Sequence, residues 1–306
     1  MLLKVNKNID YDPRPQPLIK QDGYETFFKN TIVNSGVMCA APVAQILQPA
    51  NPLGVLMDHD YHCKDDPIES FLQREKITEI SQMEADALQR ATVGQSINQT
   101  WKAERLKRLT SSMFGRICKM TERTNGVVLA RSLLVDREIM SAAVRHGRTY
   151  ELEAVQKYEK QTGKVAHECG LFVSTDYPFL CASPDRILEG NCLLEVKCPY
   201  TAKNKPITPV TVPYLELSNG KLALKSNHDY YYQVQGQMLC TGASCVEFAI
   251  YTMSDLCVVS IARNDEFIRN MTDKLAEFFR HFFRWALINK YLAANYFDRV
   301  MCHCNK

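Results

Sequence analysis

The chain has 306 residues, a net charge of +3 and 46% hydrophobic residues, values typical of a globular protein with an ample core. No apolar run approaches the roughly 20 residues that a membrane-spanning helix needs, which excludes a transmembrane protein. The first residues also lack the apolar core of a secretory signal. We therefore predict an intracellular protein, in the nucleus or the cytoplasm, whose twelve cysteines are reduced thiols.

The N-terminal quarter is predicted to be irregular. Prolines interrupt any long periodicity over residues 1–75, so we treat this stretch as an N-terminal extension. Helical patterns follow at 77–90 and at 98–109, and Thr110-Ser111-Ser112 is expected to cap a further helix. We place the main domain at 76–297 and a short tail at 298–306.

Positive charge is concentrated in one segment of the chain. Residues 101–148 hold eleven basic residues against four acidic ones, a net charge of +7 that exceeds the excess of the whole chain. Such a segment suits a phosphate backbone, although a solvated helix face is the commoner explanation for any single charge.

A long amphipathic helix is predicted over 137–161, because its apolar residues recur at three- and four-residue spacing. Gly147 and Glu151 lie on the same apolar stripe. A glutamate on a buried face is costly unless it pairs with a cation. Glu151 is therefore either a salt-bridged core residue or, as we prefer, a carboxylate directed at a metal ion.

Pro184-Asp185 and, nine residues later, Glu195-Val196-Lys197 form the most informative pattern. The apolar run 192–198 predicts a strand, on which Glu195 and Lys197 share one face. A hairpin with the preceding run 179–187 would bring Asp185 beside Glu195. Two adjacent carboxylates repel each other unless a hard divalent cation binds them. The alternative is an exposed ion pair next to an ordinary Pro-Asp turn.

The remaining elements complete an α/β domain. A polar loop extends to about 227, and a helix over 229–240 places Gln233 and Gln237 one turn apart. The runs 245–251 and 256–262 alternate as a hairpin, and a long helix is expected over 265–293. This order predicts a mixed central sheet flanked by helices.

Five motifs in this order resemble the YqaJ-like viral recombinase family, which includes the phage lambda-type exonuclease, within the PD-(D/E)XK nuclease superfamily. The resemblance extends over about 101–251, and its motifs are specific only in combination. They are Trp101-x3-Arg105-Leu106-x3-Thr110-x-Ser112, Gly147-x3-Glu151, Ala182-Ser183-Pro184-Asp185, Glu195-Val196-Lys197-Cys198-Pro199 and Tyr232-Gln233-Val234-Gln235. The resemblance implies a restriction-endonuclease-like fold.

The resemblance also implies roles for individual residues. Asp185 and Glu195, with the Val196 carbonyl, would hold Mg²⁺ or Mn²⁺, and Glu151 would ligate or support a second ion, directly or through water. Lys197 would polarise the attacking water, helped by Gln233. The residues that correspond to the pocket for a 5′-terminal phosphate are Arg105, Ser112 and Ser183.

These residues predict a metal-dependent deoxyribonuclease, a 5′→3′ exonuclease that acts on the ends of linear double-stranded DNA in recombination or repair. A single-strand annealing protein and further copies of the chain are the partners that the resemblance suggests. One departure favours an alternative, a catalytically inactive DNA-binding protein that retains the fold. The family commonly has Gly after the motif aspartate, where this chain has Arg186, and arginine adopts a left-handed turn only at a cost. An endonuclease acting on RNA or branched DNA also fits the motifs.

Overall fold

The computed structural model describes residues 78–135 and 141–290. The predicted N-terminal extension, the C-terminal tail and the first part of the predicted helix 137–161 lie partly or wholly outside them. The domain boundaries at 76 and 297 therefore stay predictions.

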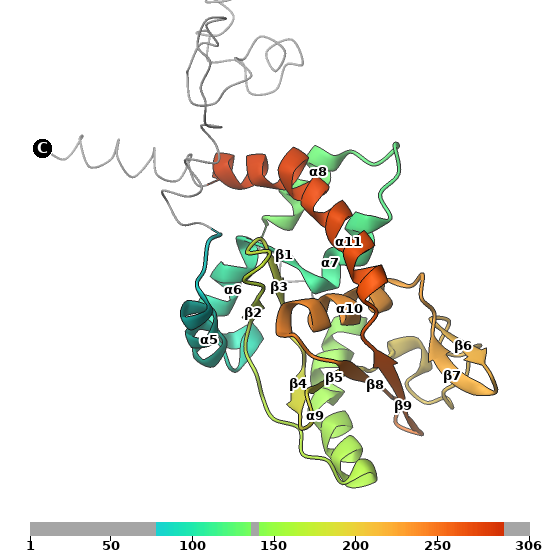
Figure 1. Cartoon of the computed structure of the whole chain (residues 1–306). Helices are drawn as coiled ribbons and strands as arrows, with labels where there is room; N and C mark the ends of the chain where they lie inside the picture. Colours follow the sequence, from blue (N-terminus) through green and yellow to red (C-terminus); the bar gives the residue numbers. More distant parts are fainter. Residues whose placement is uncertain (1–77, 136–140, 291–306) are drawn as a thin grey trace, which may run out of the picture. The chain divides into compact units, whose positions relative to one another are not determined.

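A four-stranded mixed sheet forms the centre of the domain, with the strand order β4-β5-β8-β9 (Figure 1). Its strands are β4 (Arg186–Leu188), β5 (Cys192–Lys197), β8 (Cys245–Tyr251) and β9 (Leu256–Ala262). β4 pairs antiparallel with β5, β5 parallel with β8, and β8 antiparallel with β9. The hairpin predicted from alternation at 245–262 is thereby confirmed. The hairpin predicted between the runs 179–187 and 192–198 is confirmed only for 186–188, because residues 180–182 form β3 of another sheet.

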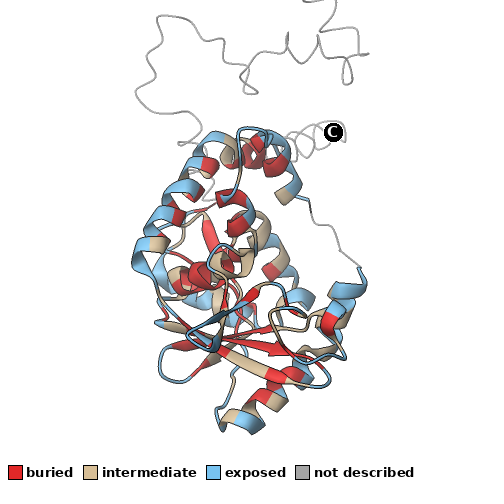
Figure 2. Cartoon of the chain, turned by 90° about the vertical axis from the view of Figure 1, so that its right-hand side faces the viewer, coloured by how far each residue is buried: buried red, intermediate tan, exposed pale blue. Residues whose placement is uncertain are grey.

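Helices α9 (Ala142–Thr162) and α10 (Asp229–Thr241) pack on opposite faces of this sheet. Side chains alternate along β5, so Leu194 contacts the α9 side and Leu193 the α10 side. The two inner strands, β5 and β8, are largely buried, and Figure 2 shows the sheet as mostly red and tan. The predicted mixed α/β fold class is confirmed.

The other elements surround this centre. β1, β3 and β2 form a small sheet, β6 and β7 form a separate hairpin, and α7, α8, α10 and α11 share a second apolar core. Their bounds are α5 (Gln82–Ala91), η1 (Gln95–Ile97), α6 (Gln99–Leu106), β1 (Leu109–Thr110), α7 (Ser111–Cys118), α8 (Gly126–Leu133), β2 (Phe172–Val173), β3 (Leu180–Ala182), η2 (Tyr200–Ala202), β6 (Leu215–Ser218), β7 (Lys221–Leu224), α11 (Asp265–Phe278) and η3 (Phe279–Phe283).

Capping residues set the helix ends more sharply than the apolar pattern predicts. α5 begins after Ser81 rather than near 77, because Ser81 and Glu84 form a capping box. Gly163 caps the C-terminus of α9 and Gly242 that of α10, both in the left-handed conformation that favours glycine. The last predicted helix contains a π-helical segment, η3, and stays helical to the end of the described residues.

Two features differ from the sequence-based expectation. The polar loop before α10 contains the hairpin β6-β7, whose turn residues Asn219 and Gly220 both have positive φ angles of 50° and 75°. Cys192 and Cys245 lie opposite each other in β5 and β8 and form a disulfide, so the prediction of reduced thiols is wrong for this pair. The other cysteines among the described residues are free.

α7 and α10 approach each other closely because each carries a glycine at the crossing. A Cβ atom on Gly236 would lie 2.5 Å from the Phe114 ring, and one on Gly115 would lie 2.6 Å from Asp229 Oδ1. This contact brings the start of α7, with Ser111 and Ser112, to the same side of the domain as the glutamines of α10.

Candidate active site

The β4-β5 hairpin places Asp185 beside Glu195, as predicted. Three residues connect the paired Leu188 and Cys192, and two of them, Gly190 and Asn191, have the positive φ angles that a tight hairpin turn needs. The resulting register pairs Arg186 with Leu194. The backbone N–H of Val196 donates to Asp185 Oδ2 at 2.7 Å, which fixes the carboxylate against β5.

Glu195 is 2% exposed, and three side chains donate hydrogen bonds to its carboxylate. Lys197 Nζ lies 2.5 Å and Gln233 Nε2 lies 2.6 Å from Glu195 Oε1. Gln237 Nε2 lies 2.6 Å from Glu195 Oε2. A buried carboxylate is costly unless it is paired and hydrogen-bonded, so α10 and β5 together make this charge tolerable.

The electrostatics of the site reflect crowded negative charge. Burial, and then the neighbouring carboxylates Glu195 and Glu151, raise the pKa of Asp185 well above its usual value. Burial lowers the pKa of Lys197, but Glu195 and Asp185 more than offset this, and the net pKa lies above its usual value. Lys197 is therefore a cation at neutral pH.

Arg186 occupies an extended position in β4, and the expected left-handed strain is absent there. Among the described residues, the non-glycine positions with positive φ are Gln95, Asn191 and Asn219. Arg186 Nη1 lies 3.4 Å from Glu151 Oε1 and 2.6 Å from the backbone oxygen of Asp185. The backbone argument for an inactive protein therefore does not hold, and Glu151 has a cationic neighbour.

One cavity of about 690 Å³, which we call the carboxylate cavity, gathers the predicted side chains. Its walls include the catalytic candidates and the phosphate-pocket candidates alike. The predicted residues that line it are Arg105, Ser112, Glu151, Ser183, Asp185, Glu195, Lys197 and Gln233. Val196 lines a smaller adjoining cavity.

The phosphate-pocket candidates are held by neighbouring side chains. Trp101 Nε1 donates to Ser183 Oγ at 2.9 Å, and the Arg105 guanidinium lies 4.0 Å above the Trp101 ring. The hydroxyls of Thr110 and Ser112 are 3.0 Å apart. A cation and two hydroxyl donors on one wall form a surface suited to a phosphate.

Three residues belong to this site that the sequence analysis did not assign to it. Gln237 holds Glu195, although its one-turn spacing from Gln233 was a usable signal. Gln95 Nε2 donates to the backbone oxygens of Pro184 at 2.7 Å and Cys169 at 3.2 Å, and so supports the turn before Asp185. Nothing in the sequence around Gln95 indicates this role. Arg148 lines the cavity one helical turn before the predicted Glu151.

The basic segment 101–148 divides between structural and exposed roles. Arg108 is buried and donates to Glu104 Oε2 at 2.6 Å, and Lys107 also pairs with Glu104. Lys119 pairs with Asp229. Arg105 and Arg148 line the carboxylate cavity. Of the segment predicted to suit a phosphate backbone, these two arginines adjoin the candidate active site.

The donor set fits a hard divalent cation. Mg²⁺ in proteins is usually held by one or two carboxylates and completed by water. Asp185 and Glu195 provide that pair, and a cation would relieve the repulsion that raises the pKa of Asp185. Among residues 78–135 and 141–290 no three acidic, histidine or cysteine side chains converge on one point, so Glu151 lies in the cavity without completing a three-carboxylate cluster.

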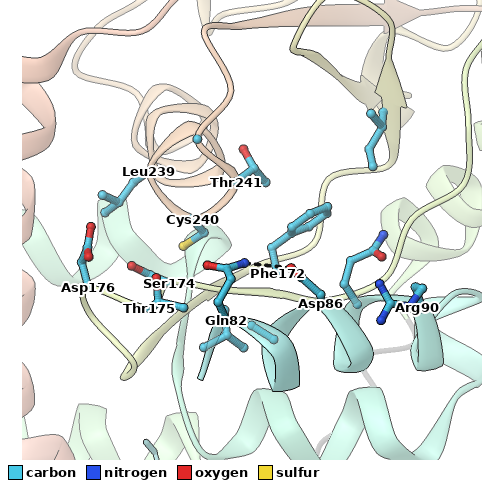
Figure 3. Close-up of a pocket in the computed structure, with 15 residues that line it drawn as sticks. Gln82, Asp86, Arg90, Phe172, Ser174, Thr175, Asp176, Leu239, Cys240 and Thr241 are labelled. Carbon is cyan, nitrogen blue, oxygen red and sulfur yellow. Dashed lines mark hydrogen bonds between the residues drawn. The ribbon is translucent and has the colours of Figure 1, made fainter. Parts of the chain in front are cut away.

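A separate cavity of about 440 Å³ lies between α5 and the C-terminal turn of α10 (Figure 3). Gln82 and Asp86 from α5 lie on one side, 2.8 Å apart, and Cys240 and Thr241 on the other. None of the predicted site residues lines it.

Every helix among residues 78–135 and 141–290 is too short or too polar to span a bilayer.

Comparison with known proteins gives a family match and two related viral proteins. Residues 100–244 match the YqaJ-like viral recombinase domain. The chain is 27% identical over 219 residues to the alkaline nuclease of Orgyia pseudotsugata multicapsid polyhedrosis virus, covering 62% of this chain and 49% of that protein. It is 25% identical over 220 residues to the alkaline nuclease of Autographa californica nuclear polyhedrosis virus, covering 59% and 47%. The chain thus spans about half the length of these curated relatives.

The fold is also similar to solved structures. An alkaline exonuclease from Laribacter hongkongensis superimposes with a TM-score of 0.51 at 24% identity, covering 64% of this chain and 97% of that one. The same enzyme in complex with dAMP gives a TM-score of 0.50 at 25% identity, covering 62% and 95%. Residues 100–244 of this chain therefore match the YqaJ-like viral recombinase domain, and the described residues have a mixed α/β fold similar to that of these alkaline exonucleases.

Proposed function

We propose that this chain is a metal-dependent deoxyribonuclease that digests linear double-stranded DNA from its 5′ ends. The observation that carries the proposal is the carboxylate cavity, in which Asp185, Glu195 and Lys197 share one space with Arg105 and Ser183. A hydrolytic group and a phosphate-binding group so arranged suit the removal of one nucleotide at a time from an end.

Each residue of the cavity has a distinct part in this mechanism. Asp185 and Glu195 would hold Mg²⁺ or Mn²⁺, with the Val196 carbonyl, and Glu151 would support the site through water. The ion supplies charge neutralisation at the phosphate and a more acidic bound water. Lys197, cationic and 2.5 Å from Glu195, places a fixed positive charge where negative charge develops on the phosphate.

Gln233 and Gln237 keep Glu195 in one orientation, because each donates to a different oxygen of its carboxylate. Gln233 also lines the cavity, where it would help to orient the attacking water. Preorganised polar groups of this kind need no rearrangement during the reaction.

Exonuclease rather than endonuclease action rests on the wall that carries Arg105, Ser112 and Ser183. Arg105, whose guanidinium lies 4.0 Å above the Trp101 ring, presents a planar cation, and Trp101 also donates to the Ser183 hydroxyl. Such a wall would bind a terminal 5′ phosphate and position the first phosphodiester bond beside Lys197.

The test is a time course on linear duplex labelled at the 5′ or the 3′ end, with Mg²⁺, with Mn²⁺ or with chelator. We expect early release of the 5′ label as mononucleotide and late release of the 3′ label. Rapid cleavage of closed circular DNA would contradict the exonuclease assignment. Equal digestion with chelator would contradict the metal requirement.

Two site variants and one control define the catalytic group. Asp185→Asn and Lys197→Ala should each lower kcat by at least about 10²-fold, in the range of a lost electrostatic stabiliser. Lys164→Ala is the control, because Lys164 pairs with Glu247 away from the cavity. Persistent DNA binding without any digestion by the unmodified chain would instead favour a non-catalytic DNA-binding protein.

The expected partners follow from the reaction. Digestion of one strand from the 5′ end leaves a 3′ single strand, which a single-strand annealing protein would bind. Assembly of several copies around the duplex would make digestion processive. Light scattering with and without linear duplex would report that assembly.

A further inference from the structure

A second cavity of about 340 Å³ adjoins the carboxylate cavity, and we call it the tyrosine chamber. Gly147, Tyr200, Tyr214 and Tyr230 contribute to its lining. The two cavities share Val144, Glu151, Asp185 and Lys197 in their walls. The tyrosine chamber therefore lies directly beside the proposed catalytic group, within the size range of small-molecule sites.

The lining of the chamber is aromatic on one side. The Tyr214 and Tyr230 rings are 5.0 Å apart at an interplanar angle of 80°, and Lys197 Nζ lies 4.7 Å above the Tyr230 ring. Tyr200 is 41% exposed, and Lys203 Nζ lies 5.0 Å from its ring. Aromatic side chains with nearby cations are the usual surface for an unpaired nucleotide.

Two further observations indicate a ligand. The Tyr214 hydroxyl is buried and has no hydrogen-bond partner in the described part of the chain, which is costly unless a ligand or solvent supplies one. A Cβ atom on Gly147 would meet nothing within 4 Å, so open space faces this position of α9. The lining thus combines room, aromatic faces and an unused polar group.

The position of the chamber relative to the catalytic group sets which nucleotide it could hold. A terminal phosphate on the Arg105 wall places the terminal nucleoside in the carboxylate cavity. The scissile phosphate then lies beside Asp185 and Lys197, which both cavities share. The next nucleoside along the strand therefore faces the tyrosine chamber.

We propose that the tyrosine chamber binds the nucleobase on the 3′ side of the scissile phosphate, unpaired from its complementary strand. This inference rests on the proposed nuclease function and extends it. The aromatic lining accepts any base, because every base has a π face, so the chamber would position the strand without selecting its sequence.

The test compares two 5′-phosphorylated linear duplexes, one with all its bases and one abasic at the second nucleotide. The unmodified chain should remove the first nucleotide of the complete duplex about tenfold faster, in kcat/KM, because the abasic strand cannot stack. Gly147→Leu should fill the chamber and so abolish this preference, with a kcat/KM ratio of about 1 between the two duplexes. Leucine is a better helix former than glycine, so this variant is expected to fold.

Tyrosine variants supply matched controls. Tyr200→Leu should weaken the preference and Tyr200→Phe should retain it, because phenylalanine keeps the aromatic face. Tyr177→Leu is the control, since Tyr177 is 37% exposed, close to the value for Tyr200, and is not part of the chamber. An unmodified chain that cuts both duplexes equally fast, or a Gly147→Leu variant that keeps the full preference, would overturn the proposal.

A binding measurement separates this inference from the proposed activity. 2-Aminopurine at the second nucleotide should lose fluorescence on binding to the unmodified chain in chelator, and keep it with Gly147→Leu. Quenching without any Mg²⁺-dependent cleavage would refute the nuclease and support the chamber. Cleavage with equal quenching in both proteins would support the nuclease and refute the chamber.

Discussion

Replacing Gln237 by Met separates the role of this side chain in the site from its role in the core. Gln237 is fully buried and donates to Glu195 Oε2 at 2.6 Å, while its own carbonyl oxygen Oε1 is buried without a partner among the described residues. Methionine keeps the length of the side chain, removes the donor and also removes the unsatisfied oxygen.

The two changes have opposite effects on the free energy of unfolding. Loss of a hydrogen bond to a charged group costs about 1.5–3 kcal/mol, and removal of a buried unsatisfied acceptor returns about 1–3 kcal/mol. We therefore expect Gln237→Met to lower the free energy of unfolding by only about 1 kcal/mol. The Glu195 carboxylate, held by one glutamine instead of two, should lose its fixed orientation, and kcat should fall about tenfold or more.

Gln235 provides a matched control on the same helix. It is also fully buried, but it donates to the Ala262 oxygen and accepts from the Asn264 N–H, each at 2.9 Å, away from the carboxylates. Gln235→Met leaves both backbone groups without their hydrogen-bond partner and should lower the free energy of unfolding by about 2 kcal/mol. Its kcat should nevertheless stay near that of the unmodified chain at a temperature where both variants are folded.

Urea unfolding and exonuclease assays on the same preparations would compare the two variants. If Gln237→Met retains full kcat, Glu195 does not depend on its second glutamine. If kcat instead follows the loss of stability in both variants, the effect of Gln237 is structural only. Either result would refute the reasoning.

Three further perturbations test the surrounding groups. Burial and nearby carboxylates raise the pKa of Asp185 above its unfolded value, so the metal-free fold should lose stability as pH rises through that raised pKa. Asp185→Asn should flatten this pH dependence of the thermal unfolding temperature. An unchanged pH profile in the variant would contradict the assignment. Arg186→Gln removes a cation beside Glu151 and should lower the Mg²⁺ concentration for half-maximal activity about fivefold, whereas an increase would show that Arg186 supports the site. Trp101→Phe keeps an aromatic ring under Arg105 but removes the hydrogen-bond donor to Ser183. The rate preference for 5′-phosphate over 5′-hydroxyl ends should therefore fall about threefold to tenfold. An unchanged preference would place the phosphate elsewhere.

Local patterns predicted the central part of the fold well. The alternation around 245–262 gave both strands of the β8-β9 hairpin at their observed ends, and the spacing between Asp185 and Glu195 gave their juxtaposition. Both depend on contacts within a few residues, where period and turn chemistry are strong signals. Asn219-Gly220 is an equally strong turn signal, and it accounts for the β6-β7 hairpin inside the predicted polar loop.

Long-range contacts explain what the sequence could not predict. Gln95 supports the Pro184 carbonyl from almost 90 positions away, through a side chain whose type is common on surfaces. The same holds for the disulfide between Cys192 and Cys245, since it depends on the parallel pairing of β5 with β8. Arg186 was misjudged because the strand pairing, rather than a turn, sets its backbone conformation.

The position of Glu195 in an inner strand explains why the site needs α10 as well as the hairpin. β5 is flanked by β4 and β8, so a carboxylate on either of its faces is buried beneath a helix. The face toward α9 is apolar at Leu194 and Val196, whereas the opposite face meets Gln233 and Gln237. Because side chains alternate with a period of two, a slip of one residue would place Glu195 against the apolar core. The register of β5 and the side chains that α10 presents to it therefore have to be compatible. Gln233 and Gln237 stabilise the same register that places Glu195 in the candidate active site.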